Sequence, residues 1–202
     1  MPTGTPIRDI REQLFSAAER VLLRDGADAV TSRAVTTDAG VAKGILHRHF
    51  PDFDAFLAAF ALTQIEKLDV LSRQLRAAAG TGTVAGNLAD ALAEALTPTA
   101  IRSITLICSR EDLLTRLRLT TPTGIPIAAE TTKMIARYLT AERGLGRITI
   151  DTDVDLLATI LVGGAHLRAT ESDDLRLDRP ELADLLTTAI GTSANDQAHQ
   201  PT

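Results

Sequence analysis

The stretch TSRAVTTDAGVAKGILHRHF, residues 31–50, decides how the rest of the chain is interpreted. Thr31 is a residue type that caps the start of a helix, and a short helix is predicted after it over residues 32–39. Gly40 interrupts this helix, because glycine readily supplies the positive φ that a tight turn between two helices needs. Pro51 ends the next short helix, and Asp52 is positioned to cap the helix that follows. Two short helices joined by a glycine turn are the geometry of a helix-turn-helix.

The second of these helices, predicted over residues 42–50, divides into an inner and an outer side. Leu46 and Phe50 lie one turn apart and can pack inward together with Val41. The outer and flanking surfaces then present Lys43, Gly44, Ile45, His47, Arg48 and His49. Arginine and lysine bond to guanine edges or phosphates, and an apolar side chain can contact a thymine methyl group. This side is therefore predicted to enter the major groove of DNA.

The start of the preceding helix is predicted to join the same surface. Arg33 projects towards the groove, and Thr31 and Ser32 place hydroxyl and backbone N–H groups at a helix N-terminus, which favours a phosphate. The predicted DNA-binding residues are Thr31, Ser32, Arg33, Lys43, Gly44, Ile45, His47, Arg48 and His49. A bare helix-turn-helix pattern also arises by chance in helical proteins, and these side chains would then be ordinary solvated surface.

The chain resembles the TetR family of transcriptional regulators over residues 7–60. Residues 39–51, AGVAKGILHRHFP, are similar without gaps to the family's A-G-V-S-K-G-T-L-Y-H-H-F-x signature. The preceding helix resembles the family's A-A-x-x-L-F-x-x-x-G element through Phe15, Ala17, Ala18, Val21, Asp25 and Gly26. The rest of the chain has no equivalent signature.

This resemblance implies roles for individual residues. Arg33, Lys43, Gly44, Ile45, His47 and Arg48 are expected near base edges, and Ser32 and His49 are expected to contact phosphates. The chain departs from the family pattern at Ala34, Thr36, Ala42, Ile45 and His47, where Asp, Ala, Ser, Thr and Tyr are usual. These departures bear on the operator sequence and the phosphate contacts, and they leave the scaffold intact.

Helix is predicted nearly throughout, because Ala and Leu dominate and alternation of apolar and polar residues is almost absent. Besides the two short helices, the predicted helices cover residues 7–25, 52–78, 84–97, 99–108, 110–119, 127–143, 152–171 and 180–191. The fold class is predicted as all-α. A three-helix DNA-binding head with the helix-turn-helix is expected over residues 7–51, and a helical ligand-binding and dimerisation body over residues 52–192. Residues 1–6 and 193–202 are expected to be disordered tails.

A homodimer through residues 152–191 is implied by the resemblance, because the last two long helices of such proteins form a four-helix bundle with those of a second subunit. The predicted apolar stripes consist of Leu156, Leu157, Ile160 and Leu161, and of Leu182, Leu185, Leu186 and Ile190. Left uncovered, they would be an apolar surface in water. Gly163 and Gly164 lower helix propensity, and close approach of another helix would offset that cost.

A ligand pocket is expected in the body, among the helices of residues 60–140. Its candidate lining residues are Phe60, Leu106, Cys108, Leu113, Met134 and Tyr138, although residues of these types are more often plain core. His166, on the later helix over residues 152–171, is a further ligand candidate, with a core or interface residue as the more usual alternative. Cys108 follows an apolar stretch and is expected to be buried, with a redox-sensing thiol as the alternative. The acidic, aliphatic-rich body points to an apolar or cationic inducer, and a repressor without a ligand is also possible.

The composition limits the possible classes of protein. The chain has 202 residues and a net charge of −5. The first fifty residues hold seven Lys/Arg and six Asp/Glu, whereas the remainder holds fourteen and twenty. DNA contact is therefore expected in the head. No window resembles a signal peptide or approaches the ~20 apolar residues of a membrane span, so a cytoplasmic protein without a membrane partner is expected.

The sequence gives little basis for a metal site, a catalytic site or a cofactor site. His47 and His49 lie two residues apart, whereas a helical metal pair is spaced i,i+4. There is no Ser-His-Asp or Cys-His arrangement and no phosphate-binding glycine loop. We expect no enzyme activity, no metal site and no cofactor.

The sequence thus predicts a ligand-responsive homodimeric repressor that binds a palindromic operator in double-stranded DNA. An activator is not distinguished from a repressor at this level. The alternatives are a helical small-molecule-binding protein with a vestigial head, and a protein–protein adaptor built on the helical body.

Overall fold

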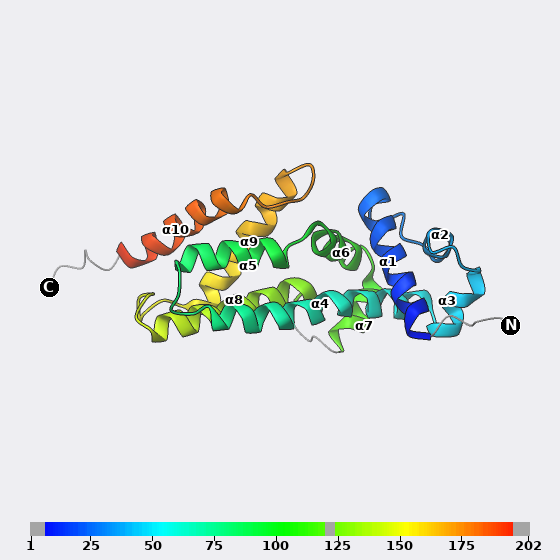
Figure 1. The fold of residues 1–202 in the computed structure, drawn as a ribbon, viewed down its shortest axis with the longest axis horizontal. Coiled ribbons are helices and arrows are strands. Elements are labelled where there is room, and N and C mark those ends of the chain that lie inside the picture. Colours follow the sequence, from blue (N-terminus) through cyan, green and yellow to red (C-terminus); the bar gives the residue numbers. More distant parts are fainter. Residues whose placement is uncertain (1–6, 120–123, 196–202) are drawn as a thin grey trace. The chain divides into compact units, whose positions relative to one another are not determined.

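The computed structural model describes residues 7–119 and 124–195, and all regular structure in these residues is helical (Figure 1). The ten described helices are α1 (Ile7–Asp25), α2 (Ser32–Asp38), α3 (Lys43–His49), α4 (Phe53–Ala77), α5 (Val84–Ala95), α6 (Pro98–Cys108), α7 (Glu111–Arg118), α8 (Pro126–Gly144), α9 (Val154–Glu171) and α10 (Arg179–Asn195). The predicted all-α class is therefore confirmed. Residues 1–6 and most of the predicted C-terminal tail lie outside the described residues.

By packing, the chain divides into two compact units. We call residues 1–64 together with 102–126 the head unit, and residues 65–101 together with 127–202 the body unit. The proposed DNA-binding region, residues 7–51, lies wholly within the head unit. The head unit also contains α7 and the second half of α6, which come much later in the sequence.

The head unit is built on the apolar side of α1. That helix has the predicted bounds, and Gly26 ends it with a φ of +88°. The buried face of α1 consists of Leu14, Ala17, Ala18, Val21 and Leu22. Val35 of α2 and Leu46 of α3 are also fully buried. Together they form one small core that holds α1, α2 and α3 against one another.

An aromatic cluster continues this core to the start of α4. Phe15 lies 5.9 Å from Phe50, 5.6 Å from Phe56 and 6.1 Å from Phe60, measured between ring centroids. Phe50 and Phe56 meet edge to face at 5.1 Å. Tilted and edge-to-face contacts of this kind suit the aromatic quadrupole and add to the burial energy. The end of α3, the middle of α1 and the start of α4 are therefore packed as one body.

The start of α4 is capped by its preceding residue, as predicted. The backbone N–H of Ala55 donates to Asp52 Oδ1 at 2.6 Å. This bond satisfies a free donor at the helix N-terminus.

In the body unit, a buried polar network joins the end of α8 to the loop before α5. The Glu142 side chain is fully buried, lies 3.2 Å from Arg147 Nη1 and accepts from the backbone N–H of Gly80. Asn87 donates to the Tyr138 hydroxyl at 2.9 Å. Burial and a hydrogen bond with Glu142 raise the pKa of the Tyr138 phenol. A buried carboxylate is tolerated here because it is paired and hydrogen-bonded.

The predicted apolar stripes of the last two helices are only partly right. Leu156 and Ile160 of α9 are each 57% exposed, whereas Leu157 and Leu161 are buried within their own chain. Successive residues of a helix point about 100° apart, so these neighbours face different ways. On α10, Leu185 is exposed and Leu182 and Leu186 are buried. Each helix therefore has one apolar side packed inside the chain and further apolar residues facing outward.

A smaller difference concerns the end of the last helix. α10 continues to Asn195, beyond the predicted end at residue 191. Among the described residues, no single helix has the length and hydropathy to cross a membrane, and α5 with α6 passes that test only as a pair bent by 59°.

Candidate nucleic-acid interface

Local hydrogen bonds set the geometry of the helix-turn-helix. Thr31 has extended backbone, and its Oγ1 accepts from the backbone N–H of Ala34 at 3.1 Å, which confirms it as the N-cap of α2. Gly40 has a φ of +66°, as predicted for the turn. Its N–H donates to the carbonyl of Thr37, and the next N–H, of Val41, donates to that of Thr36. These bonds end α2 sharply and start the chain towards α3.

α3 has one buried side and one open side. Leu46 is fully buried, and Phe50, just beyond the helix end, is nearly so. Lys43, Gly44, His47 and Arg48 are exposed, and Ile45 and His49 are half-buried. The last turn of α3 is basic, which also suits the negative end of the helix dipole. Leu46 and Phe50 are thus inner residues as predicted, whereas Val41 is only half-buried. The DNA contacts themselves remain predictions.

Gly44 stands at the open side of α3. A Cβ built on this residue would have no heavy atom within 4 Å. Its lack of a side chain is therefore not required by packing among the described residues. A partner that approaches the backbone closely gives a reason for glycine here.

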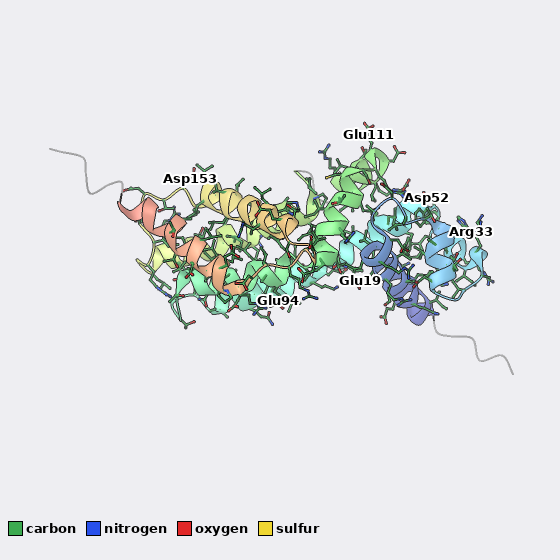
Figure 2. The ribbon with its side chains drawn as sticks, turned by 90° about the horizontal axis from the view of Figure 1, so that it is seen from above. Glu19, Arg33, Asp52, Glu94, Glu111 and Asp153 are labelled. Carbon is green, nitrogen blue, oxygen red and sulfur yellow. The ribbon has the colours of Figure 1, made fainter. Side chains whose placement is uncertain are left out.

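A surface hollow of about 370 Å³ lies beside α2 in the head unit. It is lined by Arg24, Thr31, Arg33, Ala34, Thr37 and Asp38. Thr31 and Arg33 were predicted from sequence, and Figure 2 shows Arg33 projecting from the head. Arg24 was missed, because its position near the end of α1 carries no sequence signal for this surface.

The acidic group in this hollow is already paired. Asp38 lies 2.8 Å from Arg20 Nη2 and 3.0 Å from Arg24 Nη1, and Arg24 also pairs with Asp25 at 2.7 Å. The hydrogen bond from Arg24 is the main cause that lowers the pKa of Asp38, and a bond from Arg20 acts in the same direction. The two arginines offset a carboxylate that would otherwise repel a phosphate backbone at this surface.

Ser32 differs from its neighbours in the predicted DNA-binding set. Its Oγ is buried and has no hydrogen-bond partner among the described residues, although the residue was expected to contact a phosphate. Ser32 can make that contact through its backbone N–H, or through the hydroxyl after a change of rotamer. The proposed phosphate contact stays a prediction.

The candidate ligand-pocket residues fall into two groups. Phe60, Leu106 and Leu113 are buried in the head unit, and Met134 and Tyr138 are buried in the body unit. Burial of these five agrees with either a pocket lining or a plain core. His166 is half-buried, and its Nδ1 has no hydrogen-bond partner among the described residues.

Cys108 is a correction. It was expected to be buried, and it is exposed. The apolar stretch before it does face inward, since Leu106 and Ile107 are buried, but Cys108 is the last residue of α6 and lies past that face.

Two further hollows lie in the body unit. The larger one, about 570 Å³, is lined by residues of the α8–α9 junction and the end of α10, including Arg143, Arg147 and Ile150. The smaller one, about 260 Å³, lies between the end of α9 and α10. Both are lined by residues other than the candidate ligand-pocket set. Within the described ranges, no group of three His, Cys, Asp or Glu side chains is placed to hold a metal ion.

Comparison with known proteins bears on the head first. Residues 14–60 match the model of the family described as "Bacterial regulatory proteins, tetR family". That range contains the helix-turn-helix and the aromatic cluster described above. No curated protein matches the chain.

Solved structures resemble the chain over nearly its whole length. A transcriptional regulator from Rhodococcus sp. is 21% identical with a TM-score of 0.66, and the match covers 92% of this chain and 96% of that one. FadR from Bacillus subtilis, solved with stearoyl-CoA, is 16% identical with a TM-score of 0.65 and coverages of 89% and 98%. The multidrug binding protein EbrR, solved with malachite green, is 22% identical with a TM-score of 0.63 and coverages of 92% and 99%. At these identities the likeness is one of fold.

Proposed function

We propose that the chain is a homodimeric, ligand-responsive repressor that binds a palindromic operator, because residues 14–60 match the model of the tetR family of bacterial regulatory proteins. One observation carries the proposal: the exposed side of α3 joins Lys43, Gly44, His47 and Arg48 on a helix fixed from behind by a buried Leu46. It acts in the cytoplasm as a regulator and not as an enzyme.

α3 lies in the major groove in this proposal. Arg48 bonds to a guanine edge, Lys43 to a guanine or a phosphate, and Ile45 contacts a thymine methyl group. Arg33 reaches the same groove from α2, while His49 contacts a phosphate. Phosphate contacts orient the head on the duplex, and base contacts select the sequence.

Dimerisation is proposed through α9 and α10. Leu156, Ile160 and Leu167 of α9 and Leu185 of α10 are exposed, large and apolar. Gly163 and Gly164 lie exposed on α9, and a Cβ on either would meet nothing within 4 Å. A second copy packed on this face would bury the apolar side chains and use the space above the glycines. Two heads on one symmetric dimer would then contact two half-sites of a palindrome.

The inducer is proposed to be a small apolar or cationic molecule bound in the helical body. FadR and EbrR, which share the fold, were solved with stearoyl-CoA and malachite green respectively, and this supports a small-molecule site. Such a ligand releases the operator only if it prefers the conformation that does not bind DNA. The coupling free energy in such systems is about 1–3 kcal/mol.

Selection of bound duplexes from a random DNA library, at fixed near-physiological salt, tests this function. We expect recovery of a palindrome with half-sites about one helical turn apart. Weak, salt-sensitive binding with no consensus would favour a small-molecule-binding protein with a vestigial head. A chain that stays monomeric at micromolar concentration would favour an adaptor.

A further inference from the structure

One arginine outside the proposed DNA-binding region contacts both that region and the start of α4. Arg110 lies between α6 and α7, immediately before Glu111. Its Nη2 donates to the backbone carbonyl of Val30 at 2.9 Å, across 80 residues of sequence. Its Nη1 lies 3.8 Å from Asp54 Oδ1, and its guanidinium stands over the Phe53 ring at 5.6 Å from the centroid. All of these residues belong to the head unit.

The two contact points lie on either side of the helix-turn-helix in the sequence. Val30 is fully buried and directly precedes Thr31, the N-cap of α2. Its carbonyl belongs to the peptide group whose nitrogen is that of Thr31, so the bond from Arg110 orients the backbone at which α2 begins. Phe53 and Asp54 are the first two residues of α4. Arg110 therefore holds the start of α2 and the start of α4 at fixed positions relative to each other.

Two neighbouring arginines contact the same part of the head. Arg116 of α7 pairs with Asp52, the cap of α4, at 3.0 Å. Arg102 of α6 lies close to the end of α1, since its Nη1 is 3.8 Å from where a Cβ on Gly26 would stand. The chain from 102 to 118 thus contacts both junctions, α1–α2 and α3–α4. Arg110 is the member that reaches the backbone.

We propose that Arg110 is a positioning residue for DNA binding. It fixes the point at which α2 starts. Thr31, the N-cap of α2, and Arg33 of α2 both line the hollow that also contains Asp38. The planar guanidinium of arginine suits a positioning role, because it can donate to a carbonyl, pair with a carboxylate and stack on a ring at the same time. The inference rests on the proposed function and adds to it a residue that contacts no DNA.

Operator affinity and its salt dependence show whether Arg110 positions α2 or contacts the DNA directly. Arg110→Ala is expected to weaken binding of the selected duplex by roughly tenfold, the effect of losing a charge-assisted hydrogen bond. The slope of log affinity against log salt should not change, because no phosphate contact is lost. Arg118→Ala, an exposed arginine on α7, is the matched control for the loss of one positive charge and should bind like the wild type.

Hydrogen exchange of the free full-length chain provides a readout that needs no DNA. Backbone amides of residues 27–36 should exchange roughly tenfold faster in Arg110→Ala than in Arg118→Ala, while those of α8 stay unchanged. If Arg110→Ala fails to fold, Arg110→Lys keeps the charge but loses the planar contact. Lys at this position should give a smaller loss of affinity with the same salt slope.

Three outcomes would overturn the inference. One is equal operator affinity in Arg110→Ala and Arg118→Ala. Another is a salt slope reduced by about one in Arg110→Ala, which would make Arg110 a phosphate contact. The third is unchanged exchange at residues 27–36. Recovery of no duplex in the selection is a different failure: it overturns the proposed function, while the exchange comparison still decides whether Arg110 positions α2.

Discussion

Gln13 of α1 donates a hydrogen bond of 2.8 Å from Nε2 to the backbone carbonyl of Ala39, at the end of α2. Ala39 directly precedes the turn residue Gly40. The long first helix thus holds the backbone at the point where the chain turns towards α3. The orientation of the recognition surface depends on this bond as well as on the apolar core beneath it.

Removal of this bond should cost stability. Gln13→Ala is expected to lower the free energy of unfolding by about 1 kcal/mol, the usual net effect of one neutral hydrogen bond. Chemical denaturation of the full chain measures the change. Ser16→Ala, an exposed position on the same helix, is the control and should change stability little. An equal change in the free energy of unfolding for the two substitutions would show that the Gln13–Ala39 bond does not contribute to stability.

Arg33 and Arg48 are expected to contribute directly to operator binding. Replacement of either by alanine should cost about 1–3 kcal/mol and relax the sequence preference if that residue contacts a base. A residue that contacts a phosphate would instead weaken all sequences evenly and reduce the salt slope. Titration of the selected duplex, and of single-base variants of it, distinguishes these cases. Arg73→Ala, exposed on α4, is the control, and unchanged affinity in both head variants would contradict the assigned surface.

Asp38 should make stability depend on pH in the acid range. Hydrogen bonds from Arg24 and Arg20 lower the pKa of its carboxyl in the folded state. A lowered folded pKa contributes stability above the unfolded pKa, and this contribution disappears as the pH falls through the folded pKa.

The melting temperatures of the wild type and Asp38→Asn therefore should differ at neutral pH, with the wild type higher. The gap should close as the pH falls below the ordinary value of about 3.8. Because Arg20 and Arg24 are exposed, the difference will be small. A gap that stays constant from pH 7 to the acid limit would refute the pairing as its cause.

The exposed side of α9 should control assembly. Ile160→Glu places a charge on the proposed dimer face and should convert the dimer to monomer without unfolding the chain, since Ile160 is exposed within one copy. Affinity for the full palindrome should fall, because the two half-sites are no longer bound as a unit. Analytical ultracentrifugation gives the oligomeric state. Leu119→Glu, also at an exposed leucine, should stay dimeric, and the same state for both variants would argue against this face.

The sequence was most informative where short-range physics controls the structure. The bounds of α1, the cap at Thr31, the turn at Gly40 and the cap at Asp52 were all predicted, because each depends on residues within one or two turns. The exposed residues of α3 could also be predicted. Once Leu46 and Phe50 are assigned to the core, the helical period places Lys43, Gly44, His47 and Arg48 on the opposite side.

The remaining features depend on distant parts of the chain. The contact of Arg110 with Val30 spans 80 residues, and no local pattern indicates it. The side of α9 that faces outward depends on which neighbours cover the other side, so Leu156 and Leu157 could not be separated by their type. Cys108 was misplaced for a similar reason, since an apolar stretch does not show which residue lies beyond its buried face.

Sequence-specific recognition by α3 is tested by the ratio between affinity for the selected palindrome and affinity for a scrambled duplex of the same length, measured at one physiological salt concentration. We predict a ratio on the order of 10³ or more, in the range of specific DNA-binding proteins, with a sharp decrease for Arg48→Ala. A ratio near one, with binding that disappears as salt rises, would contradict sequence-specific recognition by α3.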